Sequence, residues 1–533
     1  MGRMKVAYND DGTILGQLAP ASAVRTVEEF LDWSTEHIPM DFWALQTACP
    51  DVCYHRTQAG EILGQRLPPE KRSVFSRGID LLLQEDTDLL DIYLRNLQPK
   101  GVKVLCEIRM SDTHHRRREW DQEGCPIFSI EHPEYGIRRF DGVPGMAMDY
   151  AIEEVRAHRL AIIQEFAEQR SIDGLELNFV RWAKHFERDW GREHAAIMTE
   201  YVGQVRAILD AAAGKRACGK LVLGARVPST IHECFLAGCD VAAWIRRGHV
   251  DYVIPSEHNS TWPGLNVEQF VEAADGADCE VYGMMGDMIG GMWSGPPALT
   301  DRGLAQFPGR MGYGGMLNTP AEARAAAHNF YTWGAQGIGL WNIPNNCNTG
   351  YGKWGSDPAQ VRRMLGWIHE AIDPGRCGAG PRRYHYVPTY KYRLEQERNY
   401  KYVESHRSPH GEFKGKTLYF NEGLTGIRQT YPFRAADGRN GESLRGALRF
   451  RILHCTDEDE FAVDVNGKAV PPERLTRNVS TKDAELPWTW IELDLTHCPP
   501  LRGDNELGVT WRGGADHGLN VPCLEELDMT VEP

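Results

Sequence analysis

Short apolar runs alternate with longer segments of helical periodicity from residue 4 to about residue 372, and this alternation constrains the fold most. When every strand is followed by a helix, the strands pair in parallel, because the helix returns the chain to the starting edge of the sheet. The strand candidates are the eight runs 4–9, 40–47, 102–109, 173–180, 220–227, 250–256, 279–285 and 337–342. The helix candidates lie near 24–37, 88–99, 148–169, 192–213, 239–248, 265–275, 319–335 and 357–372.

The segment 148–169 is the clearest helix candidate. Its apolar face, at helical spacing, consists of Ile152, Val155, Ile162, Ile163 and Phe166. Eight strand–helix units are the number that closes a (β/α)8 TIM barrel. A doubly wound open sheet is the main alternative, but no glycine-rich phosphate-binding turn follows the first strand. We therefore predict an α/β fold built on a TIM barrel.

The pattern changes at the run PGRCGAGPRR, which is rich in glycine, proline and arginine. Beyond it, apolar residues recur at every second position, as in Phe461, Val463 and Val465. Period-two alternation interrupted by turns is typical of antiparallel strands. We predict a barrel at residues 1–375 as the catalytic domain, and a linker with an all-β antiparallel sandwich at residues 376–533.

Composition narrows the class of protein. The 59 Lys+Arg and 74 Asp+Glu residues give a net charge of −15, which argues against a general nucleic-acid binder, because that function needs a basic face. No stretch approaches the roughly 18 uninterrupted apolar residues of a membrane span. The 13 cysteines are scattered and lack paired metal-ligand spacing, so we expect no metal or other cofactor. Without a secretory signal the chain is expected to be cytoplasmic as given, or periplasmic or secreted if a signal was removed.

Alternation sorts the side chains of each barrel strand into two faces. In the run 102–109, Val104, Cys106 and Ile108 form the apolar outer face, and the residues between them point into the barrel. By this rule the inward-facing polar residues are Glu107, Arg109, Glu176, Asn178 and Arg226.

These inward charges allow two interpretations, because buried charges are tolerated where they are paired or functional. In the first, Arg109 and Arg226 neutralise Glu107 and Glu176 in an internal salt-bridge cluster. In the second, a carboxylate performs proton or nucleophile chemistry, while the arginines hold an anionic or polyhydroxylated ligand.

Further candidates follow the carboxyl ends of the strands, where active sites of such barrels lie. Glu257 follows the sixth strand and Asp287 the seventh, although either could equally be a solvated loop residue or a helix cap. The long segment 111–146, which contains His114, is expected to cover the barrel mouth. Trp341, in the last strand, offers an apolar face for stacking on a sugar, with core packing as the alternative.

The run IDGLELNFVRW at 172–182 resembles the strand-four signature of the glycosyl-hydrolase-like barrel families. GVKVLCEIRMSDTHH at 101–115 is similar to their third strand, and NDDG at 9–12 and LGARVPST at 223–230 also resemble this group. The segments DEDEFAVDVNG and DNELGVTW resemble the terminal sandwich of these families. One position departs from their pattern, because Asn178 stands where they usually place Asp.

The resemblance implies a glycoside hydrolase that cleaves a polysaccharide or oligosaccharide by a two-carboxylate mechanism. It suggests Glu176, paired with Glu257 or Asp287, as the catalytic set. Arg109, Arg181 and Arg226 favour an anionic substrate, either a uronate or a sulfated glycan. The residues predicted to bind substrate are Glu107, Arg109, His114, Asn178, Arg181, Arg226 and Trp341. The alternative is a non-catalytic carbohydrate-binding or scaffolding protein, because Asn178 could mark the loss of an essential carboxylate.

Overall fold

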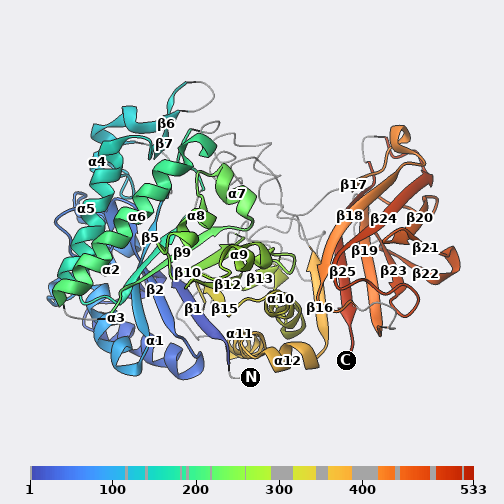
Figure 1. Cartoon of the computed structure of the whole chain (residues 1–533), viewed down its shortest axis with the longest axis horizontal. Coiled ribbons are helices and arrows are strands. Elements are labelled where there is room, and N and C mark those ends of the chain that lie inside the picture. The colour runs from blue at the N-terminus through green and yellow to red at the C-terminus, as the bar shows by residue number, and fades with distance from the viewer. Residues whose placement is uncertain are drawn as a thin grey trace.

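The computed structural model has an α/β domain followed by an all-β domain (Figure 1). It describes residues 3–113, 118–138, 142–180, 183–187, 191–216, 219–257, 260–289, 316–343, 358–386, 418–438, 444–480, 488–518 and 521–533. Among these residues, no helix combines the length and the apolar character needed to cross a membrane.

Parallel strands form a closed barrel in the first domain. They are ordered β1-β15-β12-β10-β9-β8-β5-β2, and pairing of β1 with β2 completes the ring. The barrel strands are β1 (Lys5–Asp10), β2 (Phe42–Cys49), β5 (Lys103–Arg109), β8 (Gly174–Asn178), β9 (Val222–Pro228), β10 (Tyr252–Ser256), β12 (Glu280–Met285) and β15 (Gly337–Trp341). Each overlaps the apolar run that predicted it. The TIM barrel is therefore confirmed, and the open-sheet alternative is excluded.

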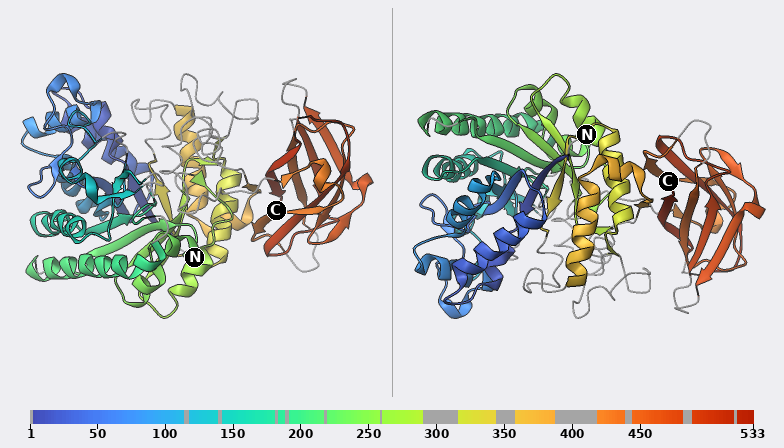
Figure 2. Two further views of the ribbon diagram at one scale, coloured as in Figure 1. Left: turned by 90° about the horizontal axis from the view of Figure 1, so that it is seen from above. Right: turned by 90° about the horizontal axis from the view of Figure 1, so that it is seen from below.

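Helices surround the barrel, as the two views of Figure 2 show. They are α1 (Ala23–His37), α2 (Val74–Gln84), α3 (Leu89–Leu97), α4 (Ile127–Glu131), α5 (Glu153–Gln169), α6 (Gly191–Arg216), α7 (Ile231–Leu236), α8 (Val241–Arg246), α9 (Val267–Ala273), α10 (Pro320–Thr332), α11 (Pro358–Ala371) and α12 (Pro374–Ala379). Short strands in the loops are β3 (Val52–Cys53), β4 (Glu61–Ile62), β6 (Gly136–Arg138), β7 (Pro144–Met148), β11 (Ser260–Thr261), β13 (Met288–Ile289) and β14 (Met316–Leu317).

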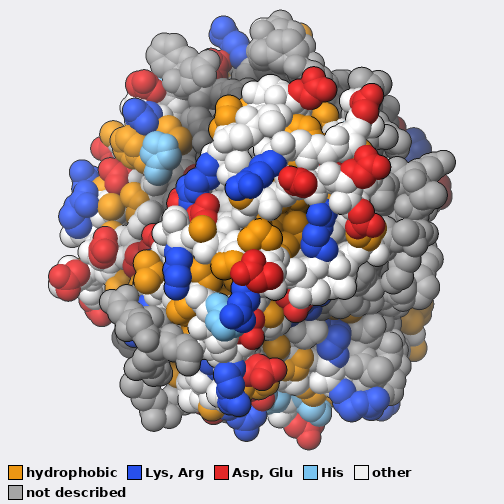
Figure 3. Space-filling model, turned by 90° about the vertical axis from the view of Figure 1, so that its right-hand side faces the viewer, with side chains coloured by type: hydrophobic (Ala, Val, Ile, Leu, Met, Phe, Trp, Pro, Cys, Tyr) orange, Lys and Arg blue, Asp and Glu red, His pale blue; other side chains and the backbone are white. Residues whose placement is uncertain are grey.

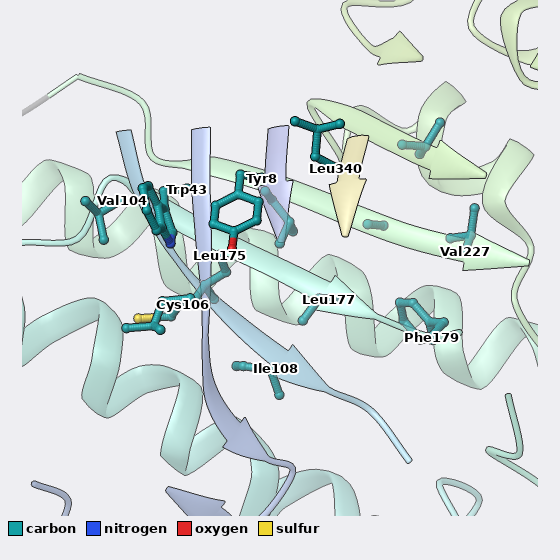
Figure 4. Packing of buried hydrophobic residues seen from close by; sticks show 14 of the residues in the cluster. Tyr8, Trp43, Val104, Cys106, Ile108, Leu175, Leu177, Phe179, Val227 and Leu340 are labelled. Atoms are coloured by element: carbon teal, nitrogen blue, oxygen red, sulfur yellow. The ribbon is translucent and has the colours of Figure 1, made fainter. Parts of the chain in front are cut away.

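The main apolar core lies between the strands and the helices. It includes Cys106 and Ile108 of β5 and Leu175 and Leu177 of β8, each at most 3% exposed (Figure 4). A smaller apolar cluster lies inside the barrel and consists of Ala7, Phe42, Ala44, Leu105, Val222, Tyr252, Ile254, Tyr282, Met284 and Trp341. Neighbouring residues of β5 thus fall into different clusters, as the alternation predicted.

Two antiparallel sheets form the second domain, which confirms the predicted sandwich. The larger has the order β16-β25-β19-β23-β22, with β17 also paired to β25, and the smaller has the order β18-β24-β20-β21. Their strands are β16 (Arg382–Tyr386), β17 (Leu418–Tyr419), β18 (Arg428–Ala435), β19 (Gly446–Leu453), β20 (Glu460–Val465), β21 (Lys468–Val470), β22 (Leu475–Ser480), β23 (Trp488–Asp494), β24 (Gly503–Gly513) and β25 (Cys523–Val531). Both sheets contribute to one core that includes Phe450 and Val509.

The predicted division at residues 375 and 376 falls within α12, and β16 already belongs to the larger sheet. That division stays a prediction. On the face seen in Figure 3, acidic and basic side chains are interspersed among the coloured atoms, so neither sign of charge dominates there.

Helix α10 links the barrel to the sandwich. Thr319 and Glu322 form a capping box at its start, and the other oxygen of Glu322 lies 2.9 Å from Nδ1 of His385. Nε2 of His385 lies 2.6 Å from Glu526 of β25. Burial opposes the charged form of His385, but the two carboxylate contacts outweigh burial and raise its pKa. The imidazolium form therefore stabilises this contact between the domains.

We predict that the free energy of unfolding falls as pH rises above about 6.5, because His385 then loses the proton that its carboxylate partners stabilise. Arg383 and Asp528 also act on this imidazole, with opposite signs. Urea unfolding across pH 5–8 would measure the effect, with His385→Gln expected to remove it. The exposed His232→Gln serves as control. An unchanged pH slope in His385→Gln would contradict the assignment.

Candidate functional site

Polar side chains of neighbouring strands meet inside the barrel toward its carboxyl ends. In the strand ladder, Glu107 of β5 pairs with Glu176 of β8, and Arg109 pairs with Asn178. Asn178 pairs in turn with Arg226 of β9. All five residues are at most 3% exposed. The structure therefore brings together five of the residues that the sequence placed in the site, in two successive layers.

Glu176 is held by donors from distant strands. Its Oε1 accepts from Nδ2 of Asn9 on β1 at 2.8 Å, and its Oε2 accepts from the hydroxyl of Tyr252 on β10 at 2.6 Å. Burial raises the pKa of Glu176, although both hydrogen bonds favour the ionised carboxylate. Within the described ranges, no arginine or lysine forms an ion pair with this carboxylate. Arg226 nevertheless lowers the pKa of Glu176 through its charge, so the salt-bridge interpretation accounts for Glu176 only in part.

Glu107 lies in a different environment. Its Oε1 accepts from Nδ2 of Asn178 at 2.6 Å, whereas its buried Oε2 has no hydrogen-bond partner among the residues that the structure describes. Burial raises the pKa of Glu107 to about 7, against the lowering effects of Arg109 and Asn178. A buried polar atom without a partner is rare and needs an explanation. Here it leaves one carboxyl oxygen available to hold a proton near neutral pH.

Arg109 forms its two shortest ion pairs with carboxylates of the loops. Its Nη2 donates to Asp11 at 2.5 Å and its Nη1 donates to Asp112 at 2.8 Å, whereas its Nε lies 4.0 Å from Glu107. The shorter contacts are the stronger ones, so Asp11 and Asp112 take most of the guanidinium charge. This ion-pair cluster holds the chain segments after β1 and β5 together.

Arg226 reaches the end of β10. Its Nε donates to the hydroxyl of Ser256 at 3.1 Å, and its Nη2 contacts the backbone carbonyl of Glu257 at 3.5 Å. The guanidinium lies 5.9 Å from the ring centroid of Trp341. Trp341 is only 3% exposed, so its ring packs within the barrel. Glu257 is 9% exposed and directly follows β10.

Asp287 takes part in a buried ion pair. Its two oxygens accept from Arg363 of α11 at 2.9 Å each, and Nε1 of Trp367 donates to Oδ1 at 3.0 Å. Asp287 is fully buried, so these contacts connect the end of β12 to the last barrel helix. His114 and Arg181, both predicted to bind substrate, lie outside the described residues.

Asn9 and Tyr252 were not identified from the sequence as partners of Glu176. Alternation along β10 could have turned Tyr252 inward, but no local pattern indicates which carboxylate it meets across the barrel. Among the described residues, no three His, Cys, Asp or Glu side chains are grouped so as to hold a metal ion. The described site therefore offers carboxyl, amide, phenol and guanidinium chemistry.

We predict that above pH 7 the free energy of unfolding of Glu107→Gln exceeds that of the unmutated protein by about 1–3 kcal/mol. The folded-state pKa of about 7 lies above the ordinary value of 4.5, so ionisation of Glu107 costs stability as pH rises through this window. Urea unfolding at pH 5 and pH 8 would measure the difference. Glu460→Gln, at an exposed position of β20, is the matched control. A Glu107→Gln profile that parallels the unmutated protein would refute the raised pKa.

No family model and no curated protein matches the chain. A similar solved structure is the PgaB glycoside hydrolase domain from Bordetella bronchiseptica, at 11% identity over 68% of this chain and 99% of that chain, with a TM-score of 0.40. The β-N-acetylhexosaminidase from Bacteroides fragilis is 11% identical over 69% and 65% of the two chains, with a TM-score of 0.38. A chitinase-like agglutinin from Robinia pseudoacacia is 10% identical over 69% and 100%, with a TM-score of 0.36. At these identities and scores the chain is assigned to no family, and its own site alone bears on its function.

Proposed function

We propose that the protein hydrolyses glycosidic bonds of a carbohydrate inside the mouth of the barrel. The observation that supports this most is the pair of buried carboxyl groups, Glu107 and Glu176, which occupy paired positions of adjacent strands. Their hydrogen-bond environments differ, and such a difference separates an acid from a carboxylate in sites of this kind. A two-carboxylate reaction needs one group of each kind.

Glu107 is the proposed general acid. With a pKa of about 7, a large fraction of this side chain holds its proton at neutral pH. Its Oε2, which has no partner among the described residues, can present that proton to the glycosidic oxygen. The proton passes to the leaving group as the bond between the anomeric carbon and that oxygen breaks.

Glu176 is the proposed nucleophile. Donation from Asn9 and Tyr252 favours its ionised form and fixes its orientation. Retaining enzymes hold their two carboxyl groups roughly 5–5.5 Å apart, so a nucleophilic Glu176 requires its carboxyl group to lie at about that distance from the carboxyl group of Glu107. Glu176 would form an ester with the sugar, and water activated by Glu107 would release it with retention.

The other predicted site residues take different places in the proposal. Glu257, at the end of β10, would bind sugar hydroxyls. Asp287 is left out of the reaction because the guanidinium of Arg363 neutralises it in an ion pair, whereas the donors to Glu176 are uncharged. Arg109 is already paired with two carboxylates, so we propose a neutral polyhydroxylated substrate in place of the anionic glycan that the arginines predicted.

A carbohydrate-binding protein without catalysis is the second candidate. It is favoured by the complete burial of Glu176 and by Asn178 at the position where the similar families carry Asp. Binding of oligosaccharides without any cleavage, across neutral, uronate-containing and sulfated glycans, would support this function and overturn the hydrolase.

We predict that Glu107→Gln lowers hydrolysis of natural oligosaccharides by about 10²–10⁴-fold, because the leaving group then receives no proton. Dinitrophenyl glycosides, whose leaving group needs no protonation, should lose much less activity. In the unmutated protein, activity should fall as pH rises through about 7, and Glu107→Gln should lack this limb. Initial rates on both substrate types across pH 5–9 test the assignment.

Glu176→Gln should abolish cleavage of both substrate types while binding persists, because no covalent intermediate can form. Product anomers followed by NMR should show retention in the unmutated protein. Undiminished cleavage by Glu176→Gln, or an inverted product, would rule out the role proposed for Glu176. Glu460→Gln again provides the control for an exposed glutamate.

A further inference from the structure

The side-chain amide of Asn9 lies inside the barrel with only one of its two polar atoms bonded. Asn9 belongs to β1 and is 1% exposed, and its Nδ2 donates to Oε1 of Glu176 at 2.8 Å. Among the residues that the structure describes, no group bonds its other polar atom, the buried Oδ1. A buried acceptor without a partner is rare, because it loses its bonds to water and gains none in return.

The orientation of this amide follows from its neighbour. The ionised carboxylate of Glu176 can only accept hydrogen bonds, so the atom of Asn9 that faces it must be the nitrogen. Tyr252 favours the same ionised form, because its hydroxyl donates to the other carboxyl oxygen at 2.6 Å. The oxygen of the amide is therefore the atom left over, and it can only accept a hydrogen bond.

Within the described ranges, the neighbouring strands supply no donor to Oδ1 of Asn9. In the strand ladder Asn9 pairs with Ala44 of β2, whose side chain has no polar atom. Two other buried atoms of the same interior, Oε2 of Glu107 and Nε of Arg109, also lack a hydrogen-bond partner among the described residues. Several unsatisfied buried atoms in one interior are expected where a bound polar molecule supplies the missing partners.

The position of Asn9 beside the proposed nucleophile determines which part of a sugar can reach Oδ1. In a reactive complex the anomeric carbon lies about 3–3.5 Å from the attacking oxygen of Glu176. The two ring atoms bonded to that carbon are the ring oxygen and carbon 2. The ring oxygen carries no hydrogen and cannot donate to Oδ1, whereas a hydroxyl or an acylamino group on carbon 2 can donate.

We propose that Asn9 selects the substituent on carbon 2 of the sugar by accepting a hydrogen bond from it through Oδ1. This inference rests on the proposed function, because Glu176 locates the anomeric carbon. It narrows the substrate to sugars with a hydrogen-bond donor at carbon 2, either a hydroxyl or the N–H of an acylamino group. Sugars with hydrogen or fluorine there leave Oδ1 unsatisfied, and one hydrogen bond of this kind changes affinity by about ten-fold.

The test is isothermal titration of the full chain with phenyl thioglycosides, whose carbon–sulfur bond resists cleavage. The series has gluco, galacto and manno rings in both anomeric forms, with hydroxyl, acetamido, hydrogen or fluorine at carbon 2. We expect a hydroxyl or an acetamido compound to bind at least about ten-fold more tightly than its hydrogen and fluorine counterparts. The tighter of the two identifies the donor. Equal binding by all four substituents, or no binding by any compound, overturns the proposal.

Two variants separate this contact from the support that Asn9 gives to Glu176. Asn9→Ala removes Oδ1 together with one donor to Glu176, whereas the matched control Tyr252→Phe removes the other donor and leaves Oδ1 in place. In Asn9→Ala the preferred compound should bind within about two-fold of its hydrogen and fluorine counterparts, and in Tyr252→Phe the preference should persist. A preference that survives in Asn9→Ala, or that is lost in Tyr252→Phe, overturns the contact.

Asn9→Leu, which has a side chain of similar size, replaces Asn9→Ala if that variant does not fold. Cleavage of the corresponding oxygen glycosides is measured separately, so that the contact and the hydrolase are tested apart. Binding that depends on the donor without any cleavage would support the contact of Asn9 and overturn the hydrolase. Cleavage without any preference at carbon 2 would overturn the contact of Asn9 alone.

Discussion

Closure of the parallel sheet, through the pairing of β1 with β2, is the constraint on which the rest of the molecule depends. A closed barrel has no free edge, and every inward side chain must share one narrow interior. Inward polar groups therefore meet partners from strands that are distant in sequence. Asn9 and Glu176 are 167 residues apart and yet lie 2.8 Å from each other. Closure of the barrel thereby brings the inward-facing polar side chains of separate strands together in one polar site.

The distribution of charge within that interior decides its chemistry. If each arginine neutralised a neighbouring glutamate, the interior would be an inert salt-bridge cluster. Instead, Arg109 forms ion pairs with Asp11 and Asp112. The uncharged side chains of Asn9 and Tyr252 donate hydrogen bonds to Glu176. Burial of Glu107 outweighs the lowering effects of Arg109 and Asn178 and raises its pKa to about 7. Asp11 thus matters for the proposed acid, because its charge raises the pKa of Glu107 against the lowering effect of Arg109.

Local sequence patterns predict the architecture because the alternation of apolar and polar residues within a strand shows which side chains point inward and which point outward. The runs around Glu107 and Glu176 show which side chains point inward, and the structure agrees. No local pattern, however, indicates which residue of a distant segment a side chain contacts. Asp287 looks like a free carboxylate after a strand until α11, 76 residues later, supplies Arg363. In the same way, Trp341 looks like a stacking platform until closure of the barrel buries it.

The proposed acid chemistry requires that Glu107 holds a proton near neutral pH. Carbon-13 NMR of the chain labelled at glutamate carboxyl carbons, titrated from pH 4 to pH 9, measures this without any substrate. We expect one carboxyl resonance that titrates near pH 7 and is missing from the spectrum of Glu107→Gln. If the resonance assigned to Glu107 titrates below about pH 5, as an ordinary glutamate does, Glu107 is not the proton donor.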